Sequence, residues 1–431
     1  MATANQKGGC WSWLVLLSGT VAFGINSGLQ LSYGVFFDSL LHTFQTTNSR
    51  VALAGALNFG SMLIFGIAGG FAGSHWGIRK ASFFGIAVAM VGYACGAFAR
   101  TIEQFIGAMT VAGIGLGILA PNIIGVQAFW FDRYRFLATG LVTTGGALGI
   151  FFMPPLAVWW LQMFGWRGAM LMNCAVACQM FVCAAIWRPF PVAATQTVER
   201  KATGAKLLAD FRFLLCSSRF WLCSSIDFFG FGCGYIYYSM ANAYMLEKGF
   251  SDSASAMVVS VTAAFSALGR LTASYAGHSE LVNRKASTLV VSYVCHVVGL
   301  VSFSCWASRW WQFATAACVF GMGHGLFLAG NVVVMLDLFG PAFMTRVIGL
   351  AVGAGGCGIF TLTPAAGALV DRFEDRRMAF WLAAVVGCIA CLLCAVLYLL
   401  QLFGERTFEP RRSVVDDDLD DNGPVEEEQP V

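Results

Sequence analysis

One segment of this chain occurs twice, and that repeat is the strongest constraint on the fold. Residues Trp130–Arg167 carry a charged start, an apolar body, a double proline and a basic end. Moved forward by 209 positions, the segment falls on Phe339–Arg376. Ten pairs then match between positions 140 and 167, where ordinary composition gives about two. They are Gly140/Gly349, Leu141/Leu350, Gly146/Gly355, Gly149/Gly358, Ile150/Ile359, Phe151/Phe360, Pro155/Pro364, Ala157/Ala366, Phe164/Phe373 and Arg167/Arg376. The sequence therefore predicts two related halves, each holding this segment in the same place.

The composition places the chain in a membrane. It is 58% apolar and only 11% charged, whereas a soluble protein is about 25% charged. The net charge of +3 gives no indication of a nucleic-acid partner. The 15 cysteines lie mostly in apolar runs, so we interpret them as small apolar residues. The pair Cys391 and Cys394 has no second pair and no histidine beside it. We therefore expect no metal and no cofactor.

The apolar runs between charge clusters define the expected helices. A spanning helix needs about 20 mostly apolar residues. We predict an all-α membrane protein with twelve transmembrane helices in two pseudo-symmetric six-helix bundles. The expected spans are 12–36, 51–73, 81–99, 105–130, 136–162, 168–187, 220–245, 255–277, 287–307, 311–338, 346–370 and 378–403. The expected divisions are an N-terminal segment 1–11, an N-terminal bundle 12–187, a linker 188–219, a C-terminal bundle 220–403 and an acidic tail 404–431.

Basic residues indicate the orientation. With both termini on one side, that side holds seventeen Lys and Arg residues, the other side holds eight, and Arg270 lies inside a span. Cytoplasmic loops carry the excess of Lys and Arg, so we predict that both termini and the linker are cytoplasmic. The tail 404–431 is acidic and almost without apolar residues, which predicts disorder. A solvated tail and a docking site for a partner both remain open.

The loop after the second expected span carries a motif. Residues 70–80 read GFAGSHWGIRK and resemble the G-x-x-x-D-R-x-G-x-R-K loop of the major facilitator superfamily. Glycines permit a tight turn, and the basic pair can anchor it at the headgroups. The matched positions are Gly70, Gly77, Arg79 and Lys80. Ser74 stands where the family has Asp, and His75 where it has Arg. The resemblance implies that this Asp latches the halves, so Ser74 predicts a weaker latch with the fold retained.

Two further stretches are similar to signatures of the monocarboxylate transporter family. Trp130–Leu141, WFDRYRFLATGL, resembles Y-F-x-K-R-R-x-L-A-x-G-L, and Arg133 and Arg135 keep two of its three basic positions. Gly8–Trp13, GGCWSW, resembles D-G-G-W-G-W, although its tryptophans also suit an interfacial anchor. The likeness runs from Trp11 to Phe403. The chain is identified as an atypical member of that family, which is solute carrier family 16-like and belongs to the major facilitator superfamily.

Arg270 is the most informative single residue. It lies inside the apolar run VVSVTAAFSALGRLTASYAG. A charge at mid-bilayer costs at least about 2.5–3.5 kcal/mol, so Arg270 is expected to face a cavity or a partner. The resemblance implies that this arginine binds the carboxylate of the substrate, a task for which the guanidinium fork is well matched. The alternative is a structural or snorkelling arginine near a helix end.

The residues that would couple transport to protons are altered. The resemblance implies an aspartate four residues before this arginine and a lysine in the first span; here these positions are Ser266 and Leu31. Proton coupling is therefore expected to be lost or moved. Asp227, in the seventh span, is a candidate partner of Arg270 or a replacement proton site, unless it is solvated near a helix end. His324, in the tenth span, is either a proton site or a packing histidine.

Other polar residues can line a central cavity. In the superfamily that the chain resembles, helices one, four, seven and ten usually do so, which suggests a substrate-binding role for Asn26, Gln30, Tyr33 and Asn331. His296, in the ninth span, is expected to be peripheral. Gly113–Gly117 and Gly321–Gly325 resemble fragments of a dinucleotide loop, but no strand precedes them, so they are interpreted as helix-packing faces.

These observations predict a transporter. We expect secondary-active or facilitative movement of monocarboxylates or related small organic anions by alternating access. A proton is the candidate co-substrate, which would make the transport a symport, and the expected location is the plasma membrane. A single-span ancillary glycoprotein is a candidate partner, as for some relatives. The alternative is a pH-independent uniporter or exchanger of a larger or neutral solute, such as an aromatic amino acid or hormone-like molecule. A non-transporting sensor or scaffold is the alternative of another class. No nucleophile, base and orienting group cluster together, so we predict no enzyme.

Overall fold

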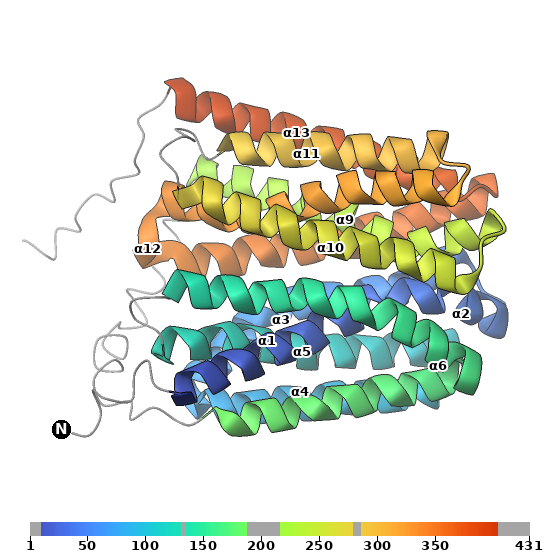
Figure 1. The fold of residues 1–431 in the computed structure, drawn as a ribbon, viewed down its shortest axis with the longest axis horizontal. Helices are drawn as coiled ribbons and strands as arrows, with labels where there is room; N and C mark the ends of the chain where they lie inside the picture. Colours follow the sequence, from blue (N-terminus) through green and yellow to red (C-terminus); the bar gives the residue numbers. More distant parts are fainter. Residues whose placement is uncertain (1–9, 131–134, 188–215, 279–285, 404–431) are drawn as a thin grey trace, which may run out of the picture.

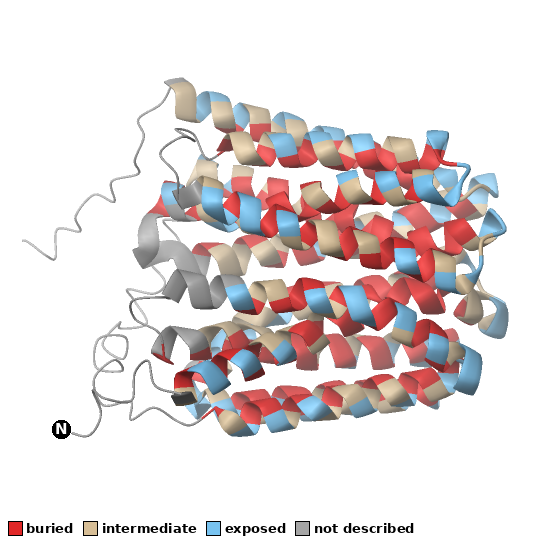
Figure 2. Ribbon diagram, viewed as in Figure 1, coloured by how far each residue is buried: buried red, intermediate tan, exposed pale blue. Residues whose placement is uncertain are grey.

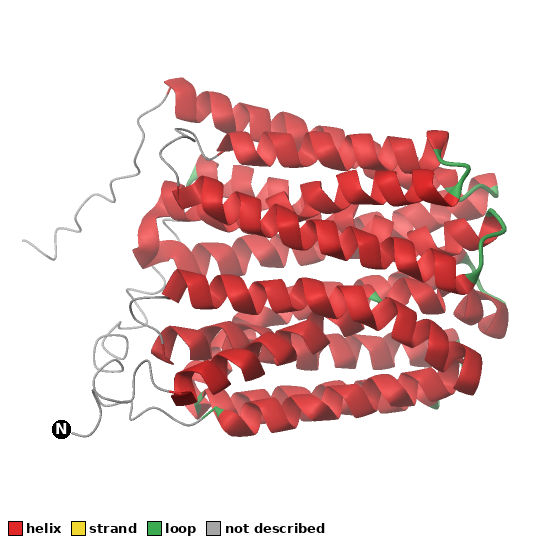
Figure 3. Cartoon of the chain, viewed as in Figure 1, coloured by secondary structure: helices red, strands yellow, loops and turns green. Residues whose placement is uncertain are grey.

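The computed structural model describes residues 10–130, 135–187, 216–278 and 286–403. Throughout these ranges the regular structure is helical, with short turns between the helices (Figure 3). The all-α fold class is therefore confirmed. The expected N-terminal segment, most of the linker and the acidic tail lie outside the described residues.

The N-terminal half contains the first set of helices. They are α1 (Cys10–Leu31), the short 3-10 helix η2 (Tyr33–Phe36), α2 (Phe37–Phe44), α3 (Asn48–Trp76), α4 (Ile78–Ala97), α5 (Ile102–Trp130) and α6 (Arg135–Ile186). The long α6 covers two expected spans. Gly165 divides it with φ 67° and ψ 176°, a conformation that glycine adopts without a side-chain clash. The two arms of α6 are thus separate spanning helices.

The C-terminal half repeats this plan. Its elements are α9 (Ser218–Glu247), α10 (Asp252–His278), α11 (Ala286–Val301), the π-helical turn η3 (Ser302–Trp306), α12 (Trp310–Phe373) and α13 (Arg377–Phe403). Helix α12 has 64 residues. A straight helix of that length would measure about 96 Å. Figure 1 instead shows α12 turning at one end of the bundle, so that it also forms two arms.

The expected spans all fall on described helices, with two corrections. Ten described segments are long and apolar enough to cross a membrane, and one of them, Leu141–Ile186, holds both arms of α6. Helix α9 is not among the ten, because its Tyr, Gly and Ser residues and Asp227 lower its mean hydropathy. The loop expected between 338 and 346 is wrong, since helical backbone continues through it. These differences leave the two-bundle architecture unchanged.

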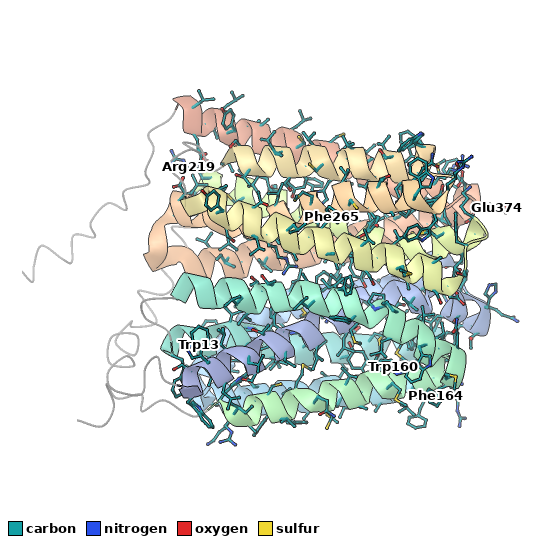
Figure 4. The ribbon with its side chains drawn as sticks, in the orientation of Figure 1. Trp13, Trp160, Phe164, Arg219, Phe265 and Glu374 are labelled. Carbon is teal, nitrogen blue, oxygen red and sulfur yellow. The ribbon has the colours of Figure 1, made fainter. Side chains whose placement is uncertain are left out.

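The two halves lie side by side and define two ends of the bundle (Figure 1). We call the end where α1 begins and α13 finishes the near end, and the opposite end the far end. Figure 4 places Trp13 and Arg219 at the near end, and Phe164 and Glu374 at the far end. The halves meet where α3 packs on α12 and where α6 packs on α10. Both contacts join elements of the duplicated segments to the other half.

Repeated glycines perform the same packing task in each half. A Cβ atom added to Gly149 would lie 1.8 Å from the carbonyl oxygen of Gly24, where α6 crosses α1. A Cβ atom added to its repeat partner, Gly358, would lie 1.9 Å from the carbonyl oxygen of Phe228, where α12 crosses α9. Small residues let membrane helices approach this closely. The repeat found in the sequence is therefore also a repeat of helix contacts.

The outer surface of the bundle is apolar. Large apolar side chains are exposed along it, among them Phe98 at 74% and Leu392 at 68% of their accessible area. Figure 2 shows exposed and buried stripes alternating along the outer helices. An apolar surface of this extent suits contact with lipid, whereas a soluble monomer exposes far smaller patches. The core therefore lies between the helices and the lipid-facing side lies outside.

Candidate functional site

The candidate site begins with Arg270, which lies where the halves meet. It is eight residues before the end of α10, about 12 Å of helix from the near end. Its side chain is buried, with 8% of the residue exposed. The guanidinium donates a hydrogen bond of 2.5 Å from Nη1 to the backbone carbonyl of Thr143 on α6. Arg270 therefore joins the halves and does not snorkel to the surface.

The guanidinium is not fully satisfied. Its Nε atom is buried without a hydrogen-bond partner, and no ion pair involves Arg270 in the described part of the chain. A buried cation without a counter-charge is costly unless water or a ligand replaces the lost solvation. The arrangement therefore leaves capacity for an anion at this point.

Unpartnered polar atoms surround Arg270. The Ser266 hydroxyl lies one helical turn earlier on α10, and it is buried without a partner. His324 on α12 precedes Gly325, where an added Cβ atom would lie 2.9 Å from the Arg270 backbone nitrogen, and Tyr238 on α9 packs on His324. Their ring centroids are 5.3 Å apart, and the Tyr238 hydroxyl and His324 Nδ1 have no hydrogen-bond partner. The sequence analysis did not single out Tyr238, because one tyrosine within the run YIYYSM carries no distinguishing pattern.

Asp227 is buried, but it is not the partner of Arg270. It is 0% exposed on α9, so the solvated alternative is wrong. Its Oδ1 accepts a hydrogen bond of 2.7 Å from the side-chain amide of Asn331 on α12, and its Oδ2 has no partner. Asn331 is therefore engaged by Asp227 within the C-terminal half. The structure brings together two candidates that are 104 positions apart and keeps them separate from Arg270.

His296 and His324, in the C-terminal half, form a buried pair. Their ring centroids are 5.8 Å apart, and Nδ1 of His296 contacts the Ser292 carbonyl at 2.9 Å. His296 is 0% exposed, so the expectation of a peripheral position is wrong. His324 also stacks on Phe320. His324 thus combines a packing position with an unpartnered ring nitrogen near Arg270.

The polar residues of the first span are buried in different settings. Asn26 donates to the Leu116 carbonyl at 3.5 Å, and its Oδ1 has no partner. Both side-chain polar atoms of Gln30 are buried and unpartnered. The Tyr33 hydroxyl donates to the Val51 carbonyl at 2.8 Å, which fixes η2 to the start of α3. In the described part, no hydrogen bond connects Asn26, Gln30 or Tyr33 with Arg270.

The loop motif lies at the near end. Gly77 separates α3 from α4 with φ 86°, a value that glycine tolerates. Arg79 and Lys80 are exposed at the start of α4, Arg79 lying 5.5 Å from the ring centroid of Phe83, and Gly70 is exposed on α3. The stretch Trp130–Leu141, which resembles the second monocarboxylate transporter signature, is only partly described. Arg133 lies outside the described residues, and Arg135 begins α6 without a described side chain. Within the described ranges, no group of three or more His, Cys, Asp or Glu is placed to hold a metal ion.

Two repeated bundles of membrane helices with buried polar residues where they meet define a membrane transporter. The sequence model of the Major Facilitator Superfamily matches residues 14–279 and 278–420. The chain belongs to this superfamily.

Curated relatives narrow the placement within the superfamily. The chain is 24% identical to Monocarboxylate transporter 11 of Mus musculus over 383 residues, covering 88% of this chain and 85% of the relative. It is 23% identical to Monocarboxylate transporter 1 of Mus musculus over 429 residues, covering 89% and 83%. A stretch of 202 residues, 46% of this chain and 42% of the relative, is 31% identical to Monocarboxylate transporter 6 of Mus musculus. The chain is thus a distant homologue of the monocarboxylate transporters.

Solved structures confirm the fold. The xylose transporter XylE from E. coli matches with a TM-score of 0.71 at 12% identity, covering 92% of this chain and 98% of that one. A POT family transporter in complex with 5-aminolevulinic acid matches with a TM-score of 0.72 at 11% identity, covering 92% and 97%. Identities this low establish the shared fold and leave the solute open.

Proposed function

We propose that this protein moves monocarboxylates or related small organic anions across a membrane by alternating access, and that Arg270 binds the carboxylate. The observation that supports the proposal is the buried, incompletely satisfied guanidinium between the halves. A guanidinium can donate two parallel hydrogen bonds to the two oxygens of a carboxylate. A backbone carbonyl has a single oxygen and cannot accept hydrogen bonds in this paired arrangement. The names of the relatives, which are monocarboxylate transporters, support the same solute class.

The cross-half bond of Arg270 suggests how binding connects to movement. Nη1 holds the Thr143 carbonyl and thereby joins α10 to α6. An arriving carboxylate competes for the same guanidinium, because charge-assisted bonds are stronger than bonds to a neutral carbonyl. The exchange removes one of the hydrogen bonds between α6 and α10 while the solute neutralises the buried charge; the Ser260 hydroxyl on α10 still donates to the Phe151 carbonyl on α6 at 2.6 Å. The unpartnered polar atoms of Tyr238, His324 and Ser266 are candidate hydrogen-bonding groups for the bound anion.

Proton symport would need another titratable group. Ser266 and Leu31 occupy the positions where the resemblance implies an acid and a lysine. Asp227 is the better replacement, because its carboxyl is fully buried and its Oδ2 has no partner. His324 is the second candidate, because its free Nδ1 lies near Arg270. The presence of Ser266 and Leu31, in place of the acid and the lysine, also favours the alternative of a pH-independent uniporter or exchanger for a larger or neutral solute.

The proposed setting is the plasma membrane, with the near end and both termini in the cytoplasm. The excess of basic residues on that side supports the orientation. A single-span ancillary glycoprotein is the proposed partner for delivery to the surface. Topology can be checked with an impermeant thiol reagent on Arg50→Cys, which the orientation places outside.

Uptake of labelled solutes tests the proposal. Cells that express the chain are given small monocarboxylates and their neutral amides at pH 6 and pH 7.5, with surface protein measured in parallel. We expect uptake of acids but not of amides, and faster uptake in acid if a proton is carried. Uptake of amides at the same rate, or uptake of neither with protein at the surface, would contradict the anion proposal and favour the larger or neutral solutes.

A further inference from the structure

A group of polar contacts joins the halves at the far end, away from Arg270. Asp371, at the end of α12, accepts hydrogen bonds from the backbone N–H groups of Asn48 at 2.8 Å and Ser49 at 3.0 Å. The side-chain amide of Asn48 donates to the same carboxylate at 2.8 Å. Asn48 and Ser49 are the first residues of α3, so a carboxylate of the C-terminal half caps a helix of the N-terminal half.

This cap replaces one that α3 does not supply. Thr47 is the N-cap residue of α3, yet its side chain makes no capping hydrogen bond. Free N–H groups and the positive end of the helix dipole both favour a negative group at this position. When the halves separate at the far end, Asp371 must leave and the first turn of α3 loses its cap. The contact therefore opposes opening of this end.

Arg376 makes the second cross-half contact. Its guanidinium binds both carboxylate oxygens of Asp38 on α2, at 2.5 Å to Oδ1 and 3.3 Å to Oδ2. It also donates to the Ala243 carbonyl on α9 and lies 3.5 Å from a carboxylate oxygen of Glu247. The side chains of Arg376 and Asp38 are only 15% and 21% exposed. A bidentate, partly buried pair of this kind is stronger than a surface ion pair.

The surrounding backbone is closely packed. The Ser49 hydroxyl donates to the Pro364 carbonyl at 3.1 Å, and a Cβ atom added to Gly367 would lie 2.6 Å from the Ser49 Cα. A polar cavity of about 280 Å³ borders these contacts, lined by Asn48, Glu247, Val370, Asp371, Glu374 and Arg376. The far end is thus closed by direct contact between the halves, with the charged groups at the rim of the closure.

We propose that the Asp371 cap of α3 and the Arg376–Asp38 pair form a latch that closes the far end and breaks in each cycle when that end opens. The arginine at the same position of the first repeat makes different contacts. Arg167, the repeat partner of Arg376, donates to the Ala99 carbonyl at 2.9 Å and lies over Trp166, within its own half. The arginine at this repeat position therefore makes contacts within its own half in the first repeat and contacts between the halves in the second. The latch does not depend on which solute is carried.

Accessibility of a buried cysteine tests the latch. Asn242 is 2% exposed and precedes Ala243, the residue whose carbonyl Arg376 holds, so Asn242→Cys reports on the closed path beneath the latch. Intact cells are treated with a membrane-impermeant maleimide, and labelling of the parent chain is subtracted. Arg50→Cys, at a residue that is exposed at the same end, establishes which face the reagent reaches. If Arg50→Cys is not labelled in intact cells, inside-out vesicles are used.

We expect Asp371→Asn and Asp38→Asn each to raise the labelling rate of Asn242→Cys about tenfold, the effect of losing one charge-assisted contact. The control is Glu103→Gln, which removes an exposed ion pair with Arg50 inside the N-terminal half at the same end and leaves the rate unchanged. Unchanged labelling in both latch variants, or faster labelling in Glu103→Gln as well, would overturn the proposal. Because the readout is labelling, it is independent of the proposed solute.

Discussion

At the scale of single residues, the central observation is that the buried cation Arg270 has no ion-pair partner among the described residues. Burial of Arg270 was predictable, because an arginine within an apolar run has few stable positions in a membrane. Its acceptor was not predictable, since every residue has a backbone carbonyl and Thr143 carries no distinguishing side-chain pattern. The same holds for Asp227 and Asn331, whose pairing depends on how α9 and α12 cross. Residue types thus revealed which groups are costly to bury, while the fold determined their partners.

The Asp227 carboxyl offers a prediction at this scale. Asp227→Asn keeps an oxygen that accepts the Asn331 amide hydrogen bond but removes the titratable group. If Asp227 carries the proton, uptake in this variant becomes equal at pH 6 and pH 7.5, while the wild type remains faster in acid. The measurement is the ratio of initial uptake rates at the two pH values, with His324→Gln as the comparison. A wild-type ratio in Asp227→Asn would exclude Asp227 as the proton site.

At the scale of helices, the repeat predicted more than composition could. It placed Gly149 and Gly358 in equivalent positions, and both are sites of close helix crossing. The continuous helical backbone between the arms of α12 was not predicted, because Arg346 suggested a loop and side-chain polarity does not report backbone hydrogen bonding. The cap of α3 by Asp371 was also missed, since it joins positions more than 300 residues apart. Local patterns therefore predicted the helices better than their ends.

Glycine substitutions test the crossing of α1 and α6. Gly149→Ala places a Cβ atom against the Gly24 backbone and should destabilise the bundle by about 1–3 kcal/mol, the usual effect of overpacking. Gly107→Ala on α5 is the matched control, because a Cβ atom there meets nothing within 4 Å. The measurement is the midpoint of thermal unfolding in detergent. Equal midpoints for the two variants would show that α1 and α6 are not in the described contact.

At the scale of the whole molecule, polar contacts join the two bundles at several points along the packed faces of α3, α6, α10 and α12. Arg270 joins α10 to α6 toward the near end, and the latch of Asp371, Arg376 and Asp38 joins the halves at the far end. In the proposed cycle, a solute that takes Arg270 from Thr143 weakens the first connection and leaves the second intact. The proposal therefore expects the two ends to open under separate control, as alternating access requires.

The acidic tail gives a prediction for the molecule as a transporter. Residues 404–431 lie outside the described helices, and their composition predicts that they add nothing to the core. A chain that ends after Phe403 should therefore reach the membrane and take up solute at the wild-type rate per surface molecule. The check is uptake normalised to surface protein. Loss of uptake with normal surface protein would instead support a function of the tail in partner binding.

The most direct measurement compares uptake of a labelled monocarboxylate by the wild type, Arg270→Ala and Arg270→Lys. Arg50→Ala, which removes an exposed arginine from the same protein, is the control. We expect at least a tenfold loss of uptake per surface molecule in Arg270→Ala, because a charge-assisted bidentate contact is removed. A smaller loss is expected in Arg270→Lys, which keeps the charge without the guanidinium fork. Arg50→Ala should transport like the wild type. Undiminished uptake by Arg270→Ala would contradict the claim that this arginine binds the carboxylate.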